Sequence, residues 1–211
     1  MLTLIGMLDS PYVRRMAVTM ELMGIPFEHR ALSVFRNYDD IKAINPAVKV
    51  PTLVCDDGEV LMDSSLIIQW LEAKFPEKTL FSKEPEVFQQ ELKVIGVALA
   101  ACEKAVQYFY EVNLRPEEKY HQPWLDRIKD QLNGNLAVLE NMIGANIKAL
   151  SDANNHASIA IATVWRFISE SVNQAADVEQ YPAIKTFSEK LEATDVFLKF
   201  PPVGPGAGNK D

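Results

Sequence analysis

The residues best placed to do chemistry are Ser10-Pro11-Tyr12-Val13, where a short apolar run gives way to a helical pattern. Serine is favoured just before a helix, and proline is favoured at the first helical position. The start of a helix presents unpaired N–H groups and about half a positive charge, so it favours anions. A hydroxyl at this position is therefore suited to stabilise an anion, including a thiolate that belongs to a ligand.

Ser10 and Val13 occupy the two positions that cysteines fill in the Cys-x-x-Cys motif of thioredoxin-like folds. Neither residue carries sulfur, so disulfide exchange at this motif is excluded. A hydrogen bond donated to an ion contributes ~1.5–3 kcal/mol, and a helix end adds ~0.3–1 kcal/mol. Together they would lower the pKa of a bound thiol by roughly one to three units, from about 8.5 toward neutrality.

Two further clusters could bind the polar groups of a ligand. Lys49-Val50-Pro51-Thr52 leads into an expected strand, and an X-Pro bond there is a candidate for the cis form, which costs only ~0.5–1 kcal/mol. A kink at Pro51 would expose the backbone N–H and C=O of Val50 to an extended peptide. Asp63-Ser64 begins a helical pattern, where a carboxylate, a hydroxyl and N–H groups can hold an α-amino acid head group.

These clusters need a mixed α/β framework to position them, and residues 1–78 predict one. Helical spacing follows Ser10 as far as Gly24, and again follows Asp63 as far as Phe75. The order is strand, helix, strand, loop or short helix, strand, strand, helix, which predicts a mixed four-stranded sheet. The expected strands cover residues 3–8, 27–32, 52–55 and 60–62.

Residues 86–200 have the texture of an all-helical domain, because a period of 3.6 residues replaces any strand pattern. Trp124, Ile128, Leu132, Leu136 and Leu139 illustrate this spacing. Residues 201–211 are rich in Pro and Gly, so we expect a flexible tail. The expected helices cover residues 86–113, 124–143, 158–176 and 182–193, with a last turn at 195–200.

Composition excludes several classes of partner. The chain of 211 residues carries 21 Lys+Arg against 29 Asp+Glu, a net charge of −8, which argues against nucleic acid. No window approaches ~18 uninterrupted apolar residues, so we expect no membrane span. No signal peptide is evident, and Cys55 and Cys102 form no disulfide framework, which favours a reducing cytoplasm. The three histidines show no metal-ligand spacing, so no metal is expected.

In order and spacing, Ser10-Pro11-Tyr12, Asn45-Pro46 leading to Lys49-Val50-Pro51, and Asp63-Ser64-Ser65 resemble the glutathione-binding motifs of glutathione S-transferases. The resemblance covers essentially the whole chain and is nearest to a bacterial, serine-type cytosolic enzyme of the beta, zeta or omega kind. It implies a thioredoxin-like N-terminal domain over 1–78 and an all-α domain over 86–200. It also implies a homodimer, with residues 86–113 and 124–143 forming much of the interface.

The resemblance further implies that glutathione is a co-substrate bound by the first domain. Ser10 would be the catalytic residue and would face the sulfur. Val50, which precedes Pro51, would pair its backbone with the cysteinyl residue of glutathione.

By the same resemblance, Asp63 and Ser64 would hold the γ-glutamyl end, and Lys49 would lie near the glycyl carboxylate. Arg14 and Arg15 could help to hold an anion, but solvated arginines in the first turn of a helix are the simpler interpretation.

The second substrate would be an electrophilic, mostly hydrophobic small molecule. Tyr12, Tyr108, Arg115 and Trp165 are candidates for lining its pocket. The competing interpretation of the aromatic residues in the helical half is that they belong to its core.

The expected function is a glutathione transferase, as in detoxification. Two alternatives stay open: a non-catalytic scaffold with the same fold, and a glutathione-dependent isomerase or dehalogenase. One departure from the family concerns the helix after Asn154-Asn155, which is expected to open with a Ser/Thr-x-x-Asp capping box. Ser158 is present, but Ile161 replaces the acidic residue, so a loss of about 1 kcal/mol is expected there.

Overall fold

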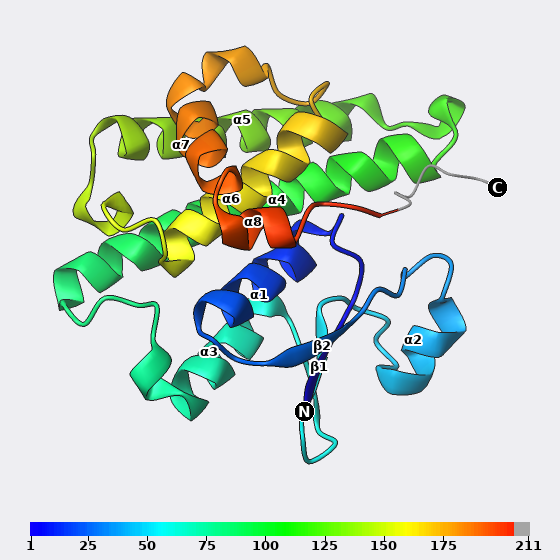
Figure 1. Cartoon of the computed structure of the whole chain (residues 1–211). Coiled ribbons are helices and arrows are strands. Elements are labelled where there is room, and N and C mark those ends of the chain that lie inside the picture. The colour runs from blue at the N-terminus through cyan, green and yellow to red at the C-terminus, as the bar shows by residue number, and fades with distance from the viewer. Residues whose placement is uncertain (205–211) are drawn as a thin grey trace. The chain divides into compact units, whose positions relative to one another are not determined.

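The computed structural model describes residues 1–204, and their helices and strands form two compact units (Figure 1). The N-terminal unit joins Met1–Leu80 with Asp195–Gly204, and the helical unit is Phe81–Thr194. The sequence analysis placed residues 195–200 in the helical domain, whereas the structure groups them with the first unit. Residues 205–211 of the expected tail lie outside the described residues.

A four-stranded sheet organises the N-terminal unit. Its order is β2-β1-β3-β4; β1 pairs parallel with β2 and antiparallel with β3, which pairs antiparallel with β4. The predicted mixed sheet is thus confirmed. The strands are β1 (Leu2–Ile5), β2 (Phe27–Arg30), β3 (Thr52–Val54) and β4 (Val60–Met62).

Apolar side chains from both the sheet and the helices build the core of this unit. Leu4 and Leu53, partners across β1 and β3, are both fully buried. Met16 of α1 and Ile67 of α3 are buried as well, and α1 packs against both β1 and α3. The helices of this part are α1 (Pro11–Leu22), α2 (Tyr38–Ile44) and α3 (Ser64–Lys74).

The C-terminal segment completes the N-terminal unit because it packs along α1. This segment contains α8 (Asp195–Lys199), which lies beside α1 in Figure 1. Buried Arg14 donates from Nε to the carbonyl of Phe200 at 2.7 Å and from Nη2 to that of Phe197 at 3.4 Å. The ring of Phe200 stacks on that of Phe27, with 6.0 Å between centroids. These contacts explain why residues 195–204 group with the N-terminal unit and not with the helical unit.

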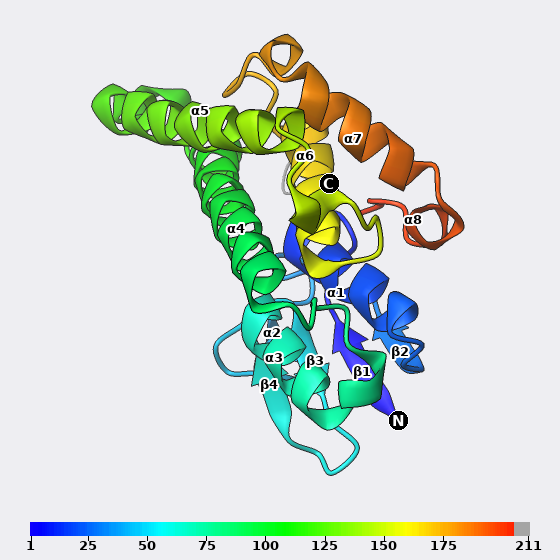
Figure 2. The same ribbon diagram turned by 90° about the vertical axis from the view of Figure 1, so that its left-hand side faces the viewer.

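Long helices make up the second unit, with α4 packed against both α5 and α6 (Figure 2). The expected apolar stripe of α5 is buried from Ile128 to Leu139, but Trp124 in the first turn is 41% exposed. The helices are α4 (Pro85–Leu114), α5 (Gln122–Gly144), α6 (His156–Ser171) and α7 (Pro182–Glu192).

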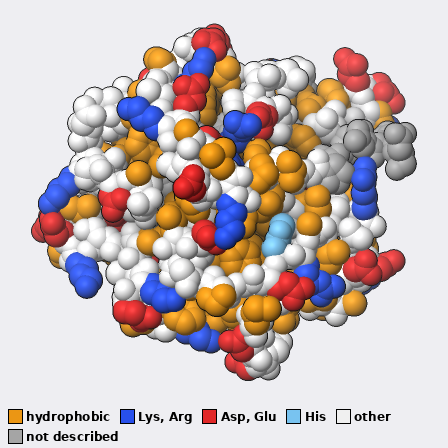
Figure 3. Space-filling model, viewed as in Figure 1, with side chains coloured by type: hydrophobic (Ala, Val, Ile, Leu, Met, Phe, Trp, Pro, Cys, Tyr) orange, Lys and Arg blue, Asp and Glu red, His pale blue; other side chains and the backbone are white. Residues whose placement is uncertain are grey.

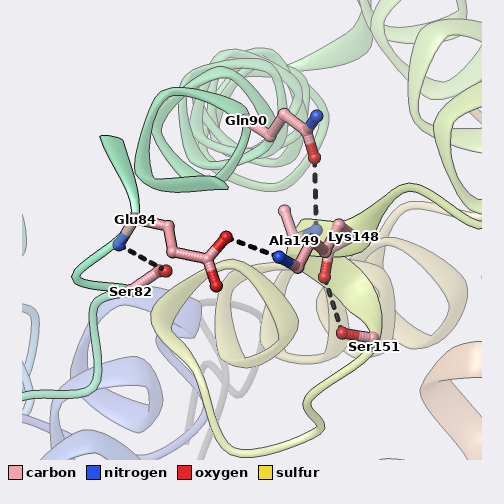
Figure 4. Close-up of polar contacts among 6 residues, drawn as sticks. All are labelled: Ser82, Glu84, Gln90, Lys148, Ala149 and Ser151. Carbon is pink, nitrogen blue, oxygen red and sulfur yellow. Dashed lines mark hydrogen bonds and ion pairs between the residues drawn. The ribbon is translucent and has the colours of Figure 1, made fainter. Parts of the chain in front are cut away.

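The first helix of this unit is tied to a distant turn by polar contacts (Figure 4). Glu84, just before α4, forms an ion pair with Lys148, and Gln90 Oε1 accepts from Ala149 N at 3.3 Å. Ser82 Oγ accepts from Glu84 N at 3.1 Å. These contacts join the start of α4 to the short helix Lys148–Leu150.

The capping box expected at the start of α6 differs from the cap that the structure has there. Asn155, not Ser158, is the N-cap, and its Oδ1 accepts from Ser158 N at 2.8 Å. Its Nδ2 donates to Ala149 O at 2.6 Å, and Ser158 Oγ donates to Asp152 O at 2.9 Å. The cap therefore lies three residues earlier than expected. Ile161 is a buried core residue, and no half of the cap is lost there.

On the face drawn in Figure 3, Lys and Arg side chains are interspersed with Asp and Glu. Within residues 1–204, every helix is too short or too polar to cross a bilayer.

Candidate functional site

Three segments that carry the expected ligand-binding residues leave the sheet at the same edge. Ile5, at the end of β1, pairs with Thr52 at the start of β3, and Thr52 pairs with Met62 at the end of β4. The β1–α1 connection, the chain before β3 and the start of α3 therefore meet there. Residues 6–10, 49–51 and 63–64 belong to these segments.

Ser10 lies at the N-terminus of α1, as the sequence predicted. Its backbone is extended, Pro11 takes the first helical position, and its Oγ accepts from Val13 N at 3.4 Å. A 3.4 Å contact is long for an N–H···O hydrogen bond, so the hydroxyl is only weakly engaged. It is free to turn its hydrogen toward an anion at the positive end of α1. Tyr12 is partly exposed in the same first turn.

Gly6 brings the β1–α1 connection against Val50. Its φ of +134° is a conformation that only glycine adopts readily. A methyl group at Gly6 would lie 2.5 Å from Val13 Cγ2 and 2.9 Å from Val50 Cβ. His29 Nε2 hydrogen-bonds to the Gly6 carbonyl at 2.8 Å, so this histidine supports the connection. Only a glycine lets the first turn of α1 and Val50 approach each other so closely.

The chain before β3 is held by buried polar side chains. Thr52 Oγ1 donates to Lys49 O at 2.6 Å and accepts from Asn45 Nδ2 at 2.9 Å. Both Asn45 and Thr52 are buried. The Val50–Pro51 peptide bond is cis, as the sequence predicted. Val50 is partly exposed and Lys49 is exposed, so both can meet a ligand.

Asp63 and Ser64 form the third part of the site. Asp63 is the N-cap of α3, and its Oδ1 accepts from Ser65 N at 2.8 Å and Leu66 N at 3.3 Å. Its φ of +71° is uncommon for a residue other than glycine and costs about 1–3 kcal/mol. Unusual backbone of this kind is concentrated at functional sites.

Arg14 and Arg15 are both buried, so the interpretation of them as solvated side chains was wrong. Arg14 binds the C-terminal segment. Arg15 donates from Nη1 to Ser64 Oγ at 2.9 Å and to Ser65 Oγ at 3.2 Å. The second arginine therefore places a positive charge directly beside the α3 part of the site.

The other three candidate residues lie in the helical unit. Tyr108 is buried on α4, and this burial raises the pKa of its phenol. Arg115 follows α4, is exposed, and pairs with Glu111 at 3.3 Å. Trp165 is buried on α6, packs edge-on against Tyr181, and lines a cavity of about 240 Å³ beside α7.

Neither the Cys55 thiol nor the metal-ligating residue types form a further reactive site within residues 1–204. Burial raises the pKa of the Cys55 thiol, and nearby Asp57 raises it further, so the thiol stays protonated at neutral pH. Among residues 1–204, His, Cys, Asp and Glu side chains do not gather in threes that could hold a metal ion.

Four residues position the site without having been given that role from the sequence: Gly6, Arg15, Asn45 and Thr52. Arg15 was taken as solvated, whereas Asn45 and Thr52 were named within the motifs but given no role of their own. A glycine inside an apolar run, as Gly6 is, signals a bulge or a close approach of the backbone, and this signal could have been used.

Residues 4–79 match the family model described as the N-terminal domain of glutathione S-transferases. A protein of Escherichia coli (strain K12) described as the uncharacterized GST-like protein YibF is 27% identical over 167 residues, which are 79% of this chain and 81% of that protein. The maleylacetoacetate isomerase of Pseudomonas aeruginosa is 30% identical over 94 residues. These are 42% of this chain and only 43% of the isomerase.

A crystal structure of a glutathione S-transferase from Methylobacterium radiotolerans, in complex with glutathione sulfonate, is similar over nearly the whole chain. The TM-score is 0.88 at 27% identity, and the match covers 96% of this chain and 95% of that one. The family match over the N-terminal part and the structural similarity over nearly the whole chain agree on a thioredoxin-like unit followed by a helical unit. The chain belongs to the glutathione S-transferase superfamily.

Proposed function

We propose that this protein is a glutathione transferase of the serine type. Glutathione binds the N-terminal unit, and its thiolate attacks an electrophilic, mostly hydrophobic small molecule. The observation that supports the proposal is the shared edge of the sheet at Ile5, Thr52 and Met62, because it brings together the three motifs that resemble those of glutathione binding. The glutathione sulfonate bound by the Methylobacterium radiotolerans enzyme supports the same ligand.

Each part of the tripeptide has a matching group in this proposal. Val50 offers its backbone to the cysteinyl residue, in the way that an exposed strand pairs with an extended peptide. Asp63 and Ser64 receive the γ-glutamyl head group. Pro51 shapes the approach to Val50, and Lys49 supplies a positive charge for the glycyl carboxylate.

Ser10 is the catalytic residue of the proposal, and it acts as a hydrogen-bond donor. A serine hydroxyl is no base at neutral pH, so it cannot remove the thiol proton itself. Donation from Oγ to the sulfur favours the thiolate by ~1.5–3 kcal/mol, and the positive end of α1 adds ~0.3–1 kcal/mol. The thiolate is the nucleophile, so this stabilisation raises the reactive fraction near pH 7.

Two measurements on the purified protein test the function. Calorimetry should detect glutathione binding, and a chlorinated nitroaromatic acceptor should be conjugated with release of chloride. Binding without turnover of any electrophile would instead favour a non-catalytic scaffold. Absence of glutathione binding would overturn the proposal.

A second candidate is a glutathione-dependent isomerase, favoured by the 30% identity to maleylacetoacetate isomerase. In that case glutathione adds to a conjugated double bond and leaves again, so it is not consumed. Incubation with a cis-configured unsaturated dicarbonyl compound and glutathione distinguishes the two. Isomerisation with unchanged total thiol indicates the isomerase, and stoichiometric loss of thiol indicates the transferase.

The residues proposed to contact the acceptor are Tyr12 on the N-terminal unit and, on the helical unit, Tyr108, Arg115 and Trp165. Exposed Arg115 suits an acceptor that carries a negative charge. Tyr108 and Trp165 are largely buried, so they would contact the acceptor through the few atoms that remain accessible.

We also propose a cytoplasmic homodimer. Both cysteines are buried thiols, which suits a reducing compartment. The family resemblance places much of the interface on the helices over 86–113 and 124–143, and Leu92 of α4, in the first of these, is 47% exposed. Sedimentation should give a dimer at micromolar concentration. Leu92→Glu, on α4, should shift it toward monomer, and the control Leu198→Glu, on α8 and outside the expected interface, should not.

A further inference from the structure

Arg15 is a buried cation beside the N-terminus of α3. Its side chain comes from the second turn of α1 and is only 2% exposed. It donates to the hydroxyl oxygens of Ser64 at 2.9 Å and Ser65 at 3.2 Å. An arginine is almost never fully buried unless its charge is paired or hydrogen-bonded.

These contacts set the direction in which Ser64 can hydrogen-bond. A guanidinium has donors and no acceptor, so the Ser64 oxygen must accept from Arg15. The hydroxyl hydrogen is then left to donate elsewhere. With a full positive charge 2.9 Å away, the group that Ser64 meets most favourably is an anion.

The adjacent residue has the opposite preference. Asp63 is exposed, and its carboxylate carries a negative charge. One carboxylate oxygen, Oδ1, accepts from two backbone N–H groups of α3. Its carboxylate can also accept from an ammonium group. Neighbouring positions thus favour an anion at Ser64 and a cation at Asp63, the two charges of an α-amino acid zwitterion.

We propose that Arg15 is a positioning residue that selects ligands carrying the α-carboxylate of a γ-glutamyl head group, acting through the hydroxyl of Ser64. The inference rests on the proposed function, since glutathione supplies that head group. Arg15 itself need not touch the ligand. Its charge and its two hydrogen bonds orient Ser64 before the ligand arrives.

The test compares two ligands that differ only in this carboxylate. Calorimetry measures the Kd of glutathione and of γ-aminobutyryl-cysteinyl-glycine, which lacks the α-carboxylate. The wild type should prefer glutathione by about tenfold or more, as expected for one charge-assisted hydrogen bond. Arg15→Gln should bind the two ligands within about threefold of each other. A role of Arg15 in folding alone would weaken both ligands equally and keep the preference.

Arg14 provides a matched control, because it is a buried arginine of the same helix with other partners. Arg14→Gln loses the hydrogen bonds to the carbonyls of Phe197 and Phe200, so it should lower thermal stability and keep the ligand preference. If Arg15→Gln does not fold, Arg15→Lys is measured instead. Lysine keeps the charge, so it should preserve at least half of the logarithmic preference.

The outcomes separate this inference from the proposed function. A wild type that binds neither ligand would end the proposed function and this inference with it. A wild type that binds glutathione, together with an Arg15→Gln that keeps the full preference, would overturn only the role of Arg15. An Arg15→Lys that binds both ligands equally would overturn it as well.

Discussion

Ser10 can stabilise a thiolate only while its hydroxyl stays at the end of the β1–α1 connection. Gly6 decides the path of that connection, because its φ of +134° turns the chain away from β1. Its missing side chain also leaves room for Val13 and Val50. Ser10 and Val50, proposed to face the sulfur and to pair with the peptide backbone, are therefore coupled through one glycine.

Gly6→Ala should lower the free energy of unfolding by at least about 2 kcal/mol and reduce activity. The backbone strain contributes ~1–3 kcal/mol, and overlap with Val13 and Val50 adds about 1–3 kcal/mol. Urea denaturation measures the loss. The control is Gly24→Ala, which also has a positive φ but meets nothing within 4 Å. If the free energy of unfolding of Gly6→Ala were equal to or greater than that of Gly24→Ala, the packing argument would be contradicted.

Residue types with local signatures could be identified from the sequence. Ser10-Pro11 and Asp63-Ser64 are capping patterns, and Val50-Pro51 is a dipeptide with a limited set of conformations. Arg15 could not be assigned, because its partners are 49 and 50 positions away. Nothing within its own helix distinguishes a buried arginine from a solvated one.

At the scale of elements, α6 and α7 depend on polar groups that lie outside them. Glu140 of α5 accepts from Ala183 N at 2.8 Å and Ile184 N at 2.9 Å, so it caps α7 from another helix. Asn155 caps α6 and also joins it to Ala149. Orphan N–H groups at a helix start must find such partners.

Asn155→Ala should destabilise the protein by about 1–3 kcal/mol. It removes an N-cap, worth ~0.5–2 kcal/mol, and leaves the Ala149 carbonyl without its side-chain donor. Thermal or urea denaturation followed by circular dichroism gives the value. Asn154→Ala is the control at an exposed neighbouring position and should change stability by less than about 0.5 kcal/mol. Equal losses in the two variants would rule out the cap.

Periodicity predicted α4, α5 and α7 to within two residues at either end, because each has a clear apolar stripe bounded by Pro or a change of pattern. It placed α6 at 158–176, whereas the helix is His156–Ser171. The residues after α6 misled the prediction, since Val172 and Ala175 are buried and apolar without being helical. Buried apolar residues in a loop can have the same spacing as the apolar stripe of a helix.

At the scale of the whole molecule, the composition shift near residue 80 predicted two units. It could not reveal that residues 195–204 belong to the first one, because 195–200 continue the helical pattern of the second unit and 201–204 begin a Pro- and Gly-rich ending that resembles a free tail. The contact that ties this segment down joins Arg14 to a carbonyl 186 residues later. Such a pairing depends on the finished fold.

The stability of the protein should fall as the pH rises above about 10. Burial raises the pKa of Tyr181 above its ordinary value, and Asp177 and Glu140 raise it further. Burial also raises the pKa of Tyr108. Above about pH 10 the unfolded chain loses these protons while the folded chain keeps them, so unfolding becomes easier.

Tyr181→Phe isolates this effect. At pH 7 it should cost about 0.5–1.5 kcal/mol, because the hydroxyl donates to Asn133 Oδ1 at 2.9 Å. Between pH 9 and 11 its free energy of unfolding should decline less steeply than that of the wild type. Urea denaturation at several pH values supplies both slopes, and parallel curves would contradict the assignment to Tyr181.

The central claim is that Ser10 at the start of α1 keeps the sulfur of glutathione deprotonated. The ultraviolet absorbance of the thiolate, followed against pH for glutathione bound to the wild type and to Ser10→Ala, measures it most directly. The account predicts a bound-thiol pKa near neutrality in the wild type and a value about one to two units higher in Ser10→Ala, with glutathione still bound by both. The same thiolate fraction in the two proteins at every pH would contradict it.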